Sequence, residues 1–96
     1  MNDKVNPKHY QRNGIQCHDA IAGAVQNLTG ADAYDTGAAI KYLWRWDEKH
    51  PDDKITDLEK TIWYIQAIID RQRDLIEQSK AKEISDYHNA LAECDE

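Results

Sequence analysis

The sequence predicts an all-α protein in which short helices pack on one long C-terminal helix, within an oligomeric helical bundle. Apolar residues recur at helical spacing in three segments, and no segment has the alternating pattern of a strand. The last 45 residues contain neither glycine nor proline, which predicts the long helix. The chain is expected to divide into an extended N-terminal arm (residues 1–14), a helical core domain (15–78) and a helical C-terminal tail (79–96).

The arm contains Asn6, Pro7, Asn13 and Gly14 without a sustained period, which is typical of an extended segment that ends in a turn. A first helix is expected to follow and to end at Gly30. The apolar residues that recur at helical spacing in it are Ile15, Cys17, Ala20, Ile21, Ala24, Val25 and Leu28.

A second helix is expected to begin between Asp32 and Thr36. It should end before the polar segment 47–54, which contains Pro51. Gly37 suits the close approach of a neighbouring backbone. The side chains expected on the inner side of this helix are Gly37, Ile40, Leu43 and Trp44.

The long helix is expected to begin at Thr56, because Thr56 and Glu59 have the spacing of a capping box. An apolar stripe with the three-and-four spacing of a heptad seam follows: Ile55, Leu58, Ile62, Ile65, Ile69 and Ile76, with Gln72 before the last. The stripe breaks over residues 79–83 and resumes in another register at Ile84, Tyr87, Leu91 and Cys94. A bend, a stutter in one helix and a gap between two helices each explain this change.

If unbroken, this helix would span roughly 60 Å, longer than a compact domain of this size can cover. Burying each large apolar side chain of the stripe is worth roughly 1.5 to 3 kcal/mol. The tail is therefore expected to need a partner chain, and the protein to form a dimer or a dimer-based assembly.

The net charge of −6 is unevenly distributed. Residues 1–51 carry six basic and six acidic side chains, whereas residues 52–96 carry six basic and twelve acidic ones. General nucleic-acid binding is not expected, because a duplex requires a basic surface. A small phosphate-bearing ligand fits the neutral half, where a few cations can hold it.

The chain contains no apolar run near the ~20 residues that a bilayer span needs. A soluble, cytoplasmic protein is expected, in which Cys17 and Cys94 stay as thiols. Several catalytic motifs are absent: glycine-rich phosphate loops, serine nucleophile elbows and helical metal motifs.

The first candidate binding group is Lys41, Trp44 and Arg45, with Lys49 one turn later. Lys41 and Arg45 are four residues apart, so their charges repel on one helix face unless an anion lies between them. Pairing of both cations with acids such as Glu48 or Asp35 explains them equally well.

The second candidate group is Asp57, Lys60, Trp63 and Tyr64, at the start of the long helix. Trp63 is off the apolar stripe, where an indole can stack on a nucleobase or pack against another helix. The arm adds His9 and Tyr10, which could contact phosphate. Asp70, Asp74 and Glu77 share a helix face that could hold Mg²⁺ through water or be a solvated charged face.

Four segments together resemble a family of small phage proteins of unknown function. That family includes SaV of a lactococcal phage and the C-terminal part of a phage nucleotide kinase that lacks a P-loop. The segments are Asn6-Pro7-Lys8-His9-Tyr10, Gly14-Ile15-Gln16-Cys17 with Asp19-Ala20-Ile21, Ala39-Ile40-Lys41-Tyr42-Leu43-Trp44-Arg45, and Asp57-Leu58-Glu59-Lys60 with Trp63-Tyr64-Ile65.

The resemblance implies a phage protein in the cytoplasm of an infected bacterium, with a nucleotide-related ligand. The positions that it carries over are His9, Tyr10, Asp19, Lys41, Arg45, Asp57, Lys60 and Tyr64. One hypothesis is phosphoryl transfer to a nucleoside monophosphate, with Asp57 as the catalytic ligand of a nucleotide-bound Mg²⁺. The others are an oligomeric sponge that sequesters a nucleotide or a cyclic nucleotide signal of host defence, and a module that binds a host protein.

Overall fold

A computed structural model describes residue 5 and residues 7–94 of the chain. The elements are η1 (Lys8–Tyr10), β1 (Gln11–Arg12), β2 (Ile15–Gln16), α1 (Cys17–Ala24), α2 (Gly30–Arg45) and α3 (Lys54–Cys94). The chain is mostly helical, as predicted, and the long C-terminal helix is confirmed. Asn6 of the predicted arm and residues 95–96 of the predicted tail lie outside the described residues.

The segment expected to be an extended arm contains a single turn of 3₁₀ helix and the first strand of a small hairpin. The second strand, Ile15–Gln16, replaces the expected start of the first helix, which begins at Cys17 instead. The strands β1 and β2 pair antiparallel, with Gln11 opposite Gln16 and Arg12 opposite Ile15. The turn between them consists of Asn13 and Gly14, whose φ angles are +50° and +76°. Positive φ at both central residues is the requirement of a type I′ hairpin turn, which Asn-Gly meets best. Strands of two residues are too short to leave an alternating pattern in the sequence.

The first helix is shorter than expected and ends at Ala24. Gly30 begins α2 instead of ending the first helix, and its φ of +55° lets the chain turn into α2. The expected close approach at Gly37 is present, because a methyl group added there would lie 3.1 Å from the Ile21 side chain of α1. Gly37 therefore allows α1 and α2 to pack closely.

The long helix α3 is unbroken from Lys54 to Cys94, through the change of register in the apolar stripe. It begins before Thr56, because Asp53 is the capping residue. The Asp53 carboxylate accepts hydrogen bonds from the Thr56 backbone N–H (3.1 Å) and the Thr56 hydroxyl (2.5 Å). Thr56, predicted to be the cap, is thus the third residue of the helix and serves as a donor. None of the helices in the described residues is both long and apolar enough to cross a membrane.

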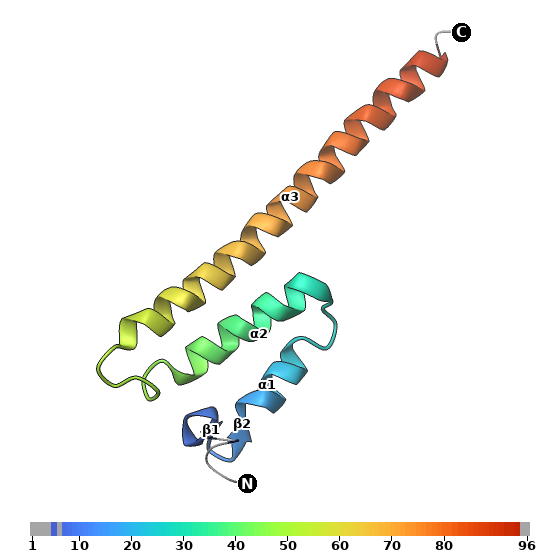
Figure 1. Cartoon of the computed structure of the whole chain (residues 1–96). Coiled ribbons are helices and arrows are strands. Elements are labelled where there is room, and N and C mark those ends of the chain that lie inside the picture. The colour runs from blue at the N-terminus through green and yellow to red at the C-terminus, as the bar shows by residue number, and fades with distance from the viewer. Residues whose placement is uncertain (1–4, 6, 95–96) are drawn as a thin grey trace.

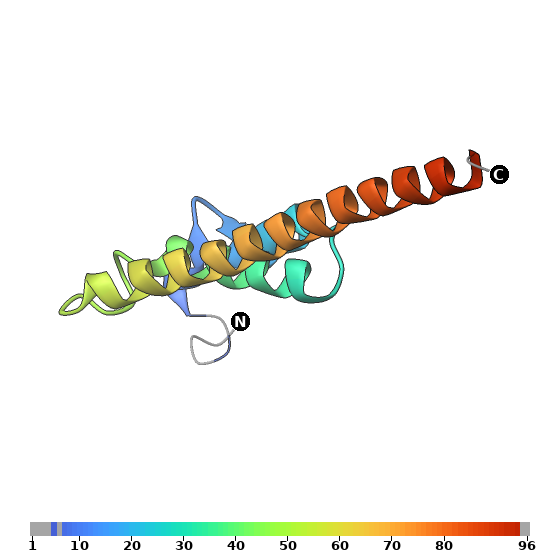
Figure 2. The same ribbon diagram turned by 90° about the horizontal axis from the view of Figure 1, so that it is seen from above.

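The helices α2 and α3 lie side by side over the first half of α3, whereas α1 packs on α2 (Figures 1 and 2). At 1.5 Å per residue, α2 covers about 24 Å of α3, which itself is about 60 Å long. The second half of α3 projects beyond the other elements, and the molecule measures 73 × 26 × 19 Å (Figure 1).

Charged side chains join α2 to α3. Arg71 donates hydrogen bonds to Asp32 and Asp35 of α2, both at 2.6 Å. Gln72, expected within the apolar stripe, also donates to Asp32 at 3.2 Å. Among the described residues, the buried hydrophobic side chains are Cys17 and Ala39, while Asp35, Arg45, Asp57 and Thr61 are buried polar ones. The packing of α2 on α3 is therefore largely polar.

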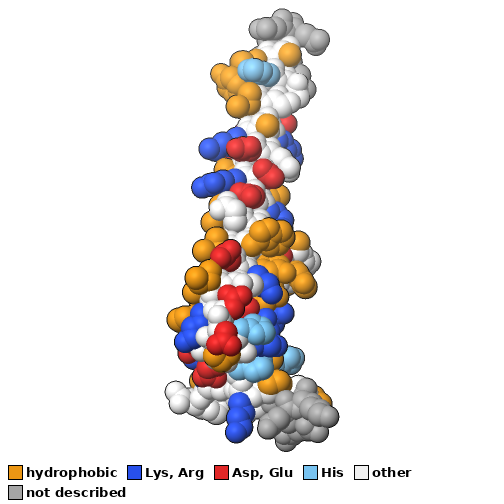
Figure 3. Space-filling model, turned by 60° about the vertical axis from the view of Figure 1, so that its left-hand side comes forward, with side chains coloured by type: hydrophobic (Ala, Val, Ile, Leu, Met, Phe, Trp, Pro, Cys, Tyr) orange, Lys and Arg blue, Asp and Glu red, His pale blue; other side chains and the backbone are white. Residues whose placement is uncertain are grey.

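Most of the apolar stripe is exposed in the isolated chain. The exposed fractions are 67% for Ile55, 65% for Ile62, 54% for Ile76 and 59% for Ile84. Leu43 of α2, expected on the inner side, is also more than half exposed. Figure 3 shows hydrophobic side chains at the surface along the length of the molecule, interrupted by charged side chains in the projecting part.

Acid is expected to destabilise the fold. Hydrogen bonds from Arg71, Arg12 and Thr56 lower the pKa values of Asp32, Asp47 and Asp53, respectively, below the ordinary value of 3.8. A carboxylate with a lowered folded-state pKa stabilises the protein above its ordinary pKa, and this stabilisation is lost as the pH falls through the lowered value. Melting temperatures should be nearly constant from pH 5 to 7 and fall below about pH 4.

The substitution Asp32→Asn should flatten the acid-side fall in melting temperature. Asp74→Asn is the matched control, because Asp74 is exposed on α3 and none of the described residues forms an ion pair with it. Equal acid slopes for the two variants and the parent protein would contradict the role given to the Arg71 bridge.

Candidate functional site

A buried ion pair connects α2 to the start of α3. Arg45 Nε and Nη2 donate to the two carboxylate oxygens of Asp57 at 3.1 and 3.4 Å, and Arg45 Nη1 donates to the Tyr10 hydroxyl at 2.7 Å. The side chains of Arg45 and Asp57 are only 8% and 1% exposed. Burial opposes the charge on Arg45, but the hydrogen bonds to Asp57 and Tyr10 outweigh it, so the pKa of Arg45 is raised. The pair therefore fixes η1, α2 and α3 against one another.

Three cations surround the ring of Tyr42. The ring centroid lies 4.5 Å from Lys41 Nζ, 4.8 Å from Arg45 Cζ and 5.1 Å from Lys60 Nζ. The negative face of an aromatic ring attracts each cation. We call these four side chains the Tyr42 cluster.

An aromatic slot lies next to the Tyr42 cluster. It is a hollow of about 250 Å³ lined by Tyr42, Lys60, Trp63 and Tyr64. The rings of Tyr42 and Tyr64 are stacked, with centroids 5.8 Å apart and planes 14° from parallel. Trp63 meets the edge of Tyr64 at 5.0 Å and is 65% exposed. An exposed indole beside a stacked pair of rings offers a surface for a planar ligand.

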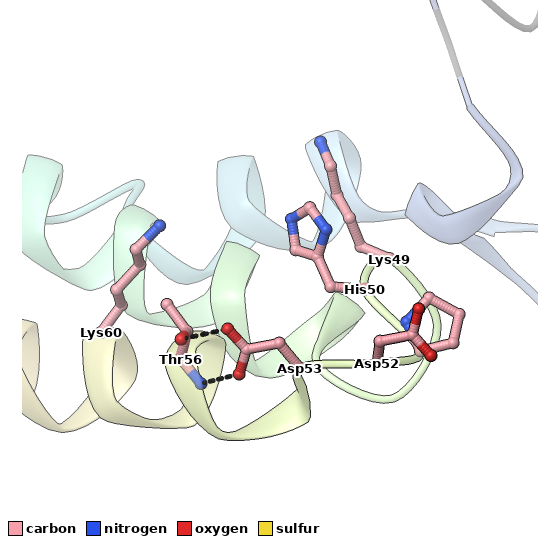
Figure 4. Close-up of a pocket in the computed structure, with 7 residues that line it drawn as sticks. Lys49, His50, Asp52, Asp53, Thr56 and Lys60 are labelled. Carbon is pink, nitrogen blue, oxygen red and sulfur yellow. Dashed lines mark hydrogen bonds between the residues drawn. The ribbon is translucent and has the colours of Figure 1, made fainter.

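A second hollow of about 330 Å³ lies where the α2–α3 loop meets the first two turns of α3. Lys49, His50 and Lys60 line it together with Asp52 and Asp53. Figure 4 shows the nitrogen ends of Lys49, His50 and Lys60 extending to the same side, while Asp53 is turned toward Thr56. We call this hollow the cation pocket. Lys60 lines both the cation pocket and the aromatic slot.

The cations of these two hollows are not neutralised by ion pairs within the described part of the chain. The described ion pairs use Arg12, His18, Arg45 and Arg71, and none of them includes Lys41, Lys49 or Lys60. Asp57 neutralises Arg45 alone. The protein is acidic as a whole, and Lys49 and Lys60 share the second hollow with Asp52 and Asp53.

The structure brings together Tyr10, Arg45 and Asp57 in the buried ion pair, and Lys41, Lys60, Trp63 and Tyr64 around Tyr42. Arg45 pairs with neither Glu48 nor Asp35, the partners considered from the sequence, because Asp35 is held by Arg71. Lys41 also lines two hollows between α1 and α2.

Three other predicted residues do not line either of the two hollows. The exposed Asp19 on α1 is 3.7 Å from His18 and contacts no member of the Tyr42 cluster. Trp44 is half-buried and lines neither hollow. His9 lies 4.3 Å from the Tyr10 ring, and burial, followed by the charges of Lys49 and Arg45, lowers its pKa. Of these three residues, His9 is the one whose charge environment includes Lys49 and His50 of the cation pocket.

Sequence reasoning missed Tyr42 and His50 as candidate residues. Tyr42 is three residues before Arg45, so the helical period alone could have placed its ring beside that cation. His50 gave no such signal, because a loop residue has no period and its position depends on how the loop closes.

The arrangement does not support a metal site at Asp57, because Arg45 occupies both of its carboxylate oxygens. Within the described residues, no group of three or more His, Cys, Asp or Glu side chains is placed to hold a metal ion. Asp70, considered for Mg²⁺, accepts a hydrogen bond from Gln66 at 2.7 Å.

The fold and the site define a small helical protein with an aromatic and cationic surface at the junction of two helices. The chain belongs to the DUF3310 family, described as proteins of unknown function, whose model matches residues 4–66. This range includes η1, α1, α2 and the first 13 residues of α3, and hence every residue of both hollows. Neither the comparison with curated proteins nor that with solved structures found a match.

Proposed function

We propose that this protein binds a nucleotide, with the base in the aromatic slot and the phosphate in the cation pocket. The observation that carries the proposal is that Lys60 lines both hollows. A single ligand with an aromatic ring at one end and an anionic group at the other therefore fits across them. The resemblance of the sequence to the phage family with a kinase member also supports a nucleotide as the ligand.

The aromatic slot supplies the contacts with the base. Stacking of a base on an aromatic side chain is worth about 1–3 kcal/mol and tolerates any base, since every base has a π face. The exposed indole of Trp63 is available for such a contact without rearrangement of α2 and α3.

The cation pocket supplies the contacts with the phosphate. Ammonium groups form strong charge-assisted hydrogen bonds with phosphate oxygens, and Lys49 and Lys60 extend to the same side of this pocket (Figure 4). A bound phosphate would also relieve the repulsion among the cations of the Tyr42 cluster. The carboxylates of Asp52 and Asp53 also line this pocket, and their charges oppose the binding of an anion.

The proposal is binding rather than turnover. Phosphoryl transfer needs two nucleotide sites and a carboxylate free to hold Mg²⁺, and the candidate for that role, Asp57, is buried against Arg45. Binding without turnover is sufficient for a protein that sequesters a nucleotide or a cyclic nucleotide signal. The phage origin and the role in an infected cell rest on the sequence resemblance.

Thermal stabilisation by a panel of nucleoside mono-, di- and triphosphates and cyclic nucleotides tests the proposal. At a ligand concentration one hundred times Kd, binding stabilises the folded state by about 2.7 kcal/mol, which raises Tm by roughly ten degrees in a domain of this size. We expect Lys60→Ala and Trp63→Ala each to weaken binding at least about tenfold, since each removes a contact worth more than about 1.4 kcal/mol.

The matched control is Lys82→Ala, which removes an exposed cation from the projecting half of α3. Circular dichroism should show equal helicity for all three variants, because Lys60, Trp63 and Lys82 are exposed. The proposal fails if no nucleotide raises Tm. It also fails if Lys60→Ala and Trp63→Ala bind as the parent protein does.

We also propose that the protein is a homo-oligomer. The support is the exposure of the apolar stripe, together with the small number of hydrophobic side chains buried in the described part of one chain. Leaving several large apolar side chains in water is costly. A mass of two chains, or a multiple of two, is expected in light scattering at tens of micromolar.

A further inference from the structure

The apolar stripe occupies one side of α3 along its whole length. On an unbroken helix of 3.6 residues per turn, its residues from Ile55 to Leu91 fall within a sector of about 120°, despite the change of register. A strict heptad would drift about 20° per repeat around a straight helix, and the extra residue at 79–83 cancels that drift. The centre of the stripe lies about 125° around the helix from Asp57 and about 165° from Arg71, which both face α2. It is therefore free to contact another chain while α2 stays in place.

We propose that two copies of this chain pair antiparallel through the apolar stripe, with the two-fold axis between residues 74 and 75. The proposal deepens and rests on the homo-oligomer proposed above. The spacing of the stripe is palindromic about that point: three, four and three residues separate Ile55, Leu58, Ile62 and Ile65, and the same steps recur from residue 84 to residue 94.

In this antiparallel register the two ends of the stripe meet each other, while Ile69 and Ile76 lie opposite Lys80 and Arg73 of the second copy. Leu58 lies opposite Leu91 of the second copy, Ile62 opposite Tyr87, and Ile65 opposite Ile84. The break in the stripe over residues 79–83 then lies opposite residues 66–70 of the second copy. The projecting half of α3, which is uncovered in the single chain, packs on the half that carries α2 in the second copy.

The charges on the same side of α3 favour this orientation. Arg73 comes next to Glu77 of the second copy, and Lys80 comes next to Asp70. In a parallel pair in register, Arg73 would face Arg73 and Lys80 would face Lys80, and such like-charge contacts are destabilising. The length of the stripe is sufficient, since a contact strip about 60 Å long and about 10 Å wide is about 600 Å² per chain, near the lower range of specific interfaces.

The pairing also adds a residue to the aromatic slot. Trp63 lies about 110° around the helix from the centre of the stripe, level with residue 86 of the second copy. His88 of that copy lies about 90° from the centre on the same side of the pair, within about 3 Å along the axis. The imidazole of His88 therefore extends the slot next to the exposed indole of Trp63. Each dimer has two such slots, each completed by the tail of the other chain.

Disulfide crosslinking with diamide as oxidant tests the register, in a background that carries Cys94→Ser. The double variant Ile65→Cys/Ile84→Cys should form a covalent dimer on a non-reducing gel, because the two thiols are opposite each other. Neither single variant should crosslink, since identical positions are about 28 Å apart in the antiparallel pair. A disulfide within one chain cannot form, because residues 65 and 84 are also about 28 Å apart along one helix. A disulfide needs Cα atoms within about 7 Å of each other.

Crosslinking of either single variant would show a parallel pair and overturn the register while leaving the homo-oligomer intact. A monomeric mass together with no crosslinking in any variant would overturn both. His88→Ala should keep the dimer mass and weaken nucleotide binding about threefold to tenfold, and unchanged affinity would remove His88 from the slot. If no nucleotide binds at all, the crosslinking result still decides the register, so failure of the binding proposal is distinguished from failure of the pairing.

Discussion

Replacing Asp57 with asparagine is expected to destabilise the protein by about 3–5 kcal/mol, because the charge of Arg45 would remain buried without its partner. A loss of that size is a large part of the total stability of a small domain. Urea unfolding followed by circular dichroism measures it. If Asp57 were instead a catalytic metal ligand at an open site, the variant would fold normally, bind nucleotide and lose only turnover.

A matched double substitution separates the ion pair from the space that it fills. Arg45→Met with Asp57→Leu removes both charges and keeps apolar volume, so it should recover most of the stability lost in Asp57→Asn. Tyr10→Phe removes only the hydroxyl that accepts from Arg45 and should cost about 1 kcal/mol. A double variant as unstable as Asp57→Asn would contradict the interpretation of this site as a structural ion pair.

The substitution Ile65→Asp is expected to convert the homo-oligomer into monomers at micromolar concentration. It places a charge in the middle of the apolar stripe, and burial of an unpaired carboxylate is opposed by several kcal/mol, which corresponds to more than a hundredfold in Kd. The uncovered second half of α3 should then lose helicity, because an isolated helix of this length is marginal in water. Light scattering gives the mass, and circular dichroism gives the helicity.

The matched control for Ile65→Asp is Ser85→Asp, which adds the same charge on an exposed side of α3 away from the stripe. The control should keep the oligomer mass and the helicity of the parent protein. The role of the stripe would be refuted if Ile65→Asp also kept the mass of the parent, or if both variants dissociated equally.

The sequence by itself predicted the elements whose signals are local. The long α3 follows from the absence of glycine and proline after residue 51, and the close packing at Gly37 follows from a residue without a side chain. The first residue of α3 was not predicted correctly. Asp53 and Thr56 are both good capping residues, and only the path of the chain through the α2–α3 loop decides between them. The two-residue strands left no periodic signal.

The candidate site was predicted in its residue types but not in their roles. The helical period placed Lys41 near Arg45 and Lys60 near Tyr64. Only the packing of α2 on α3 decided that Arg45 is neutralised by Asp57, twelve residues away, while Lys41 and Lys60 meet at the ring of Tyr42. The sequence thus determined which faces of the helices carry charge and which carry apolar side chains, because these follow from the period of one helix. The tertiary structure decided which charges are paired, because that depends on contacts between helices whose relative positions no local period specifies.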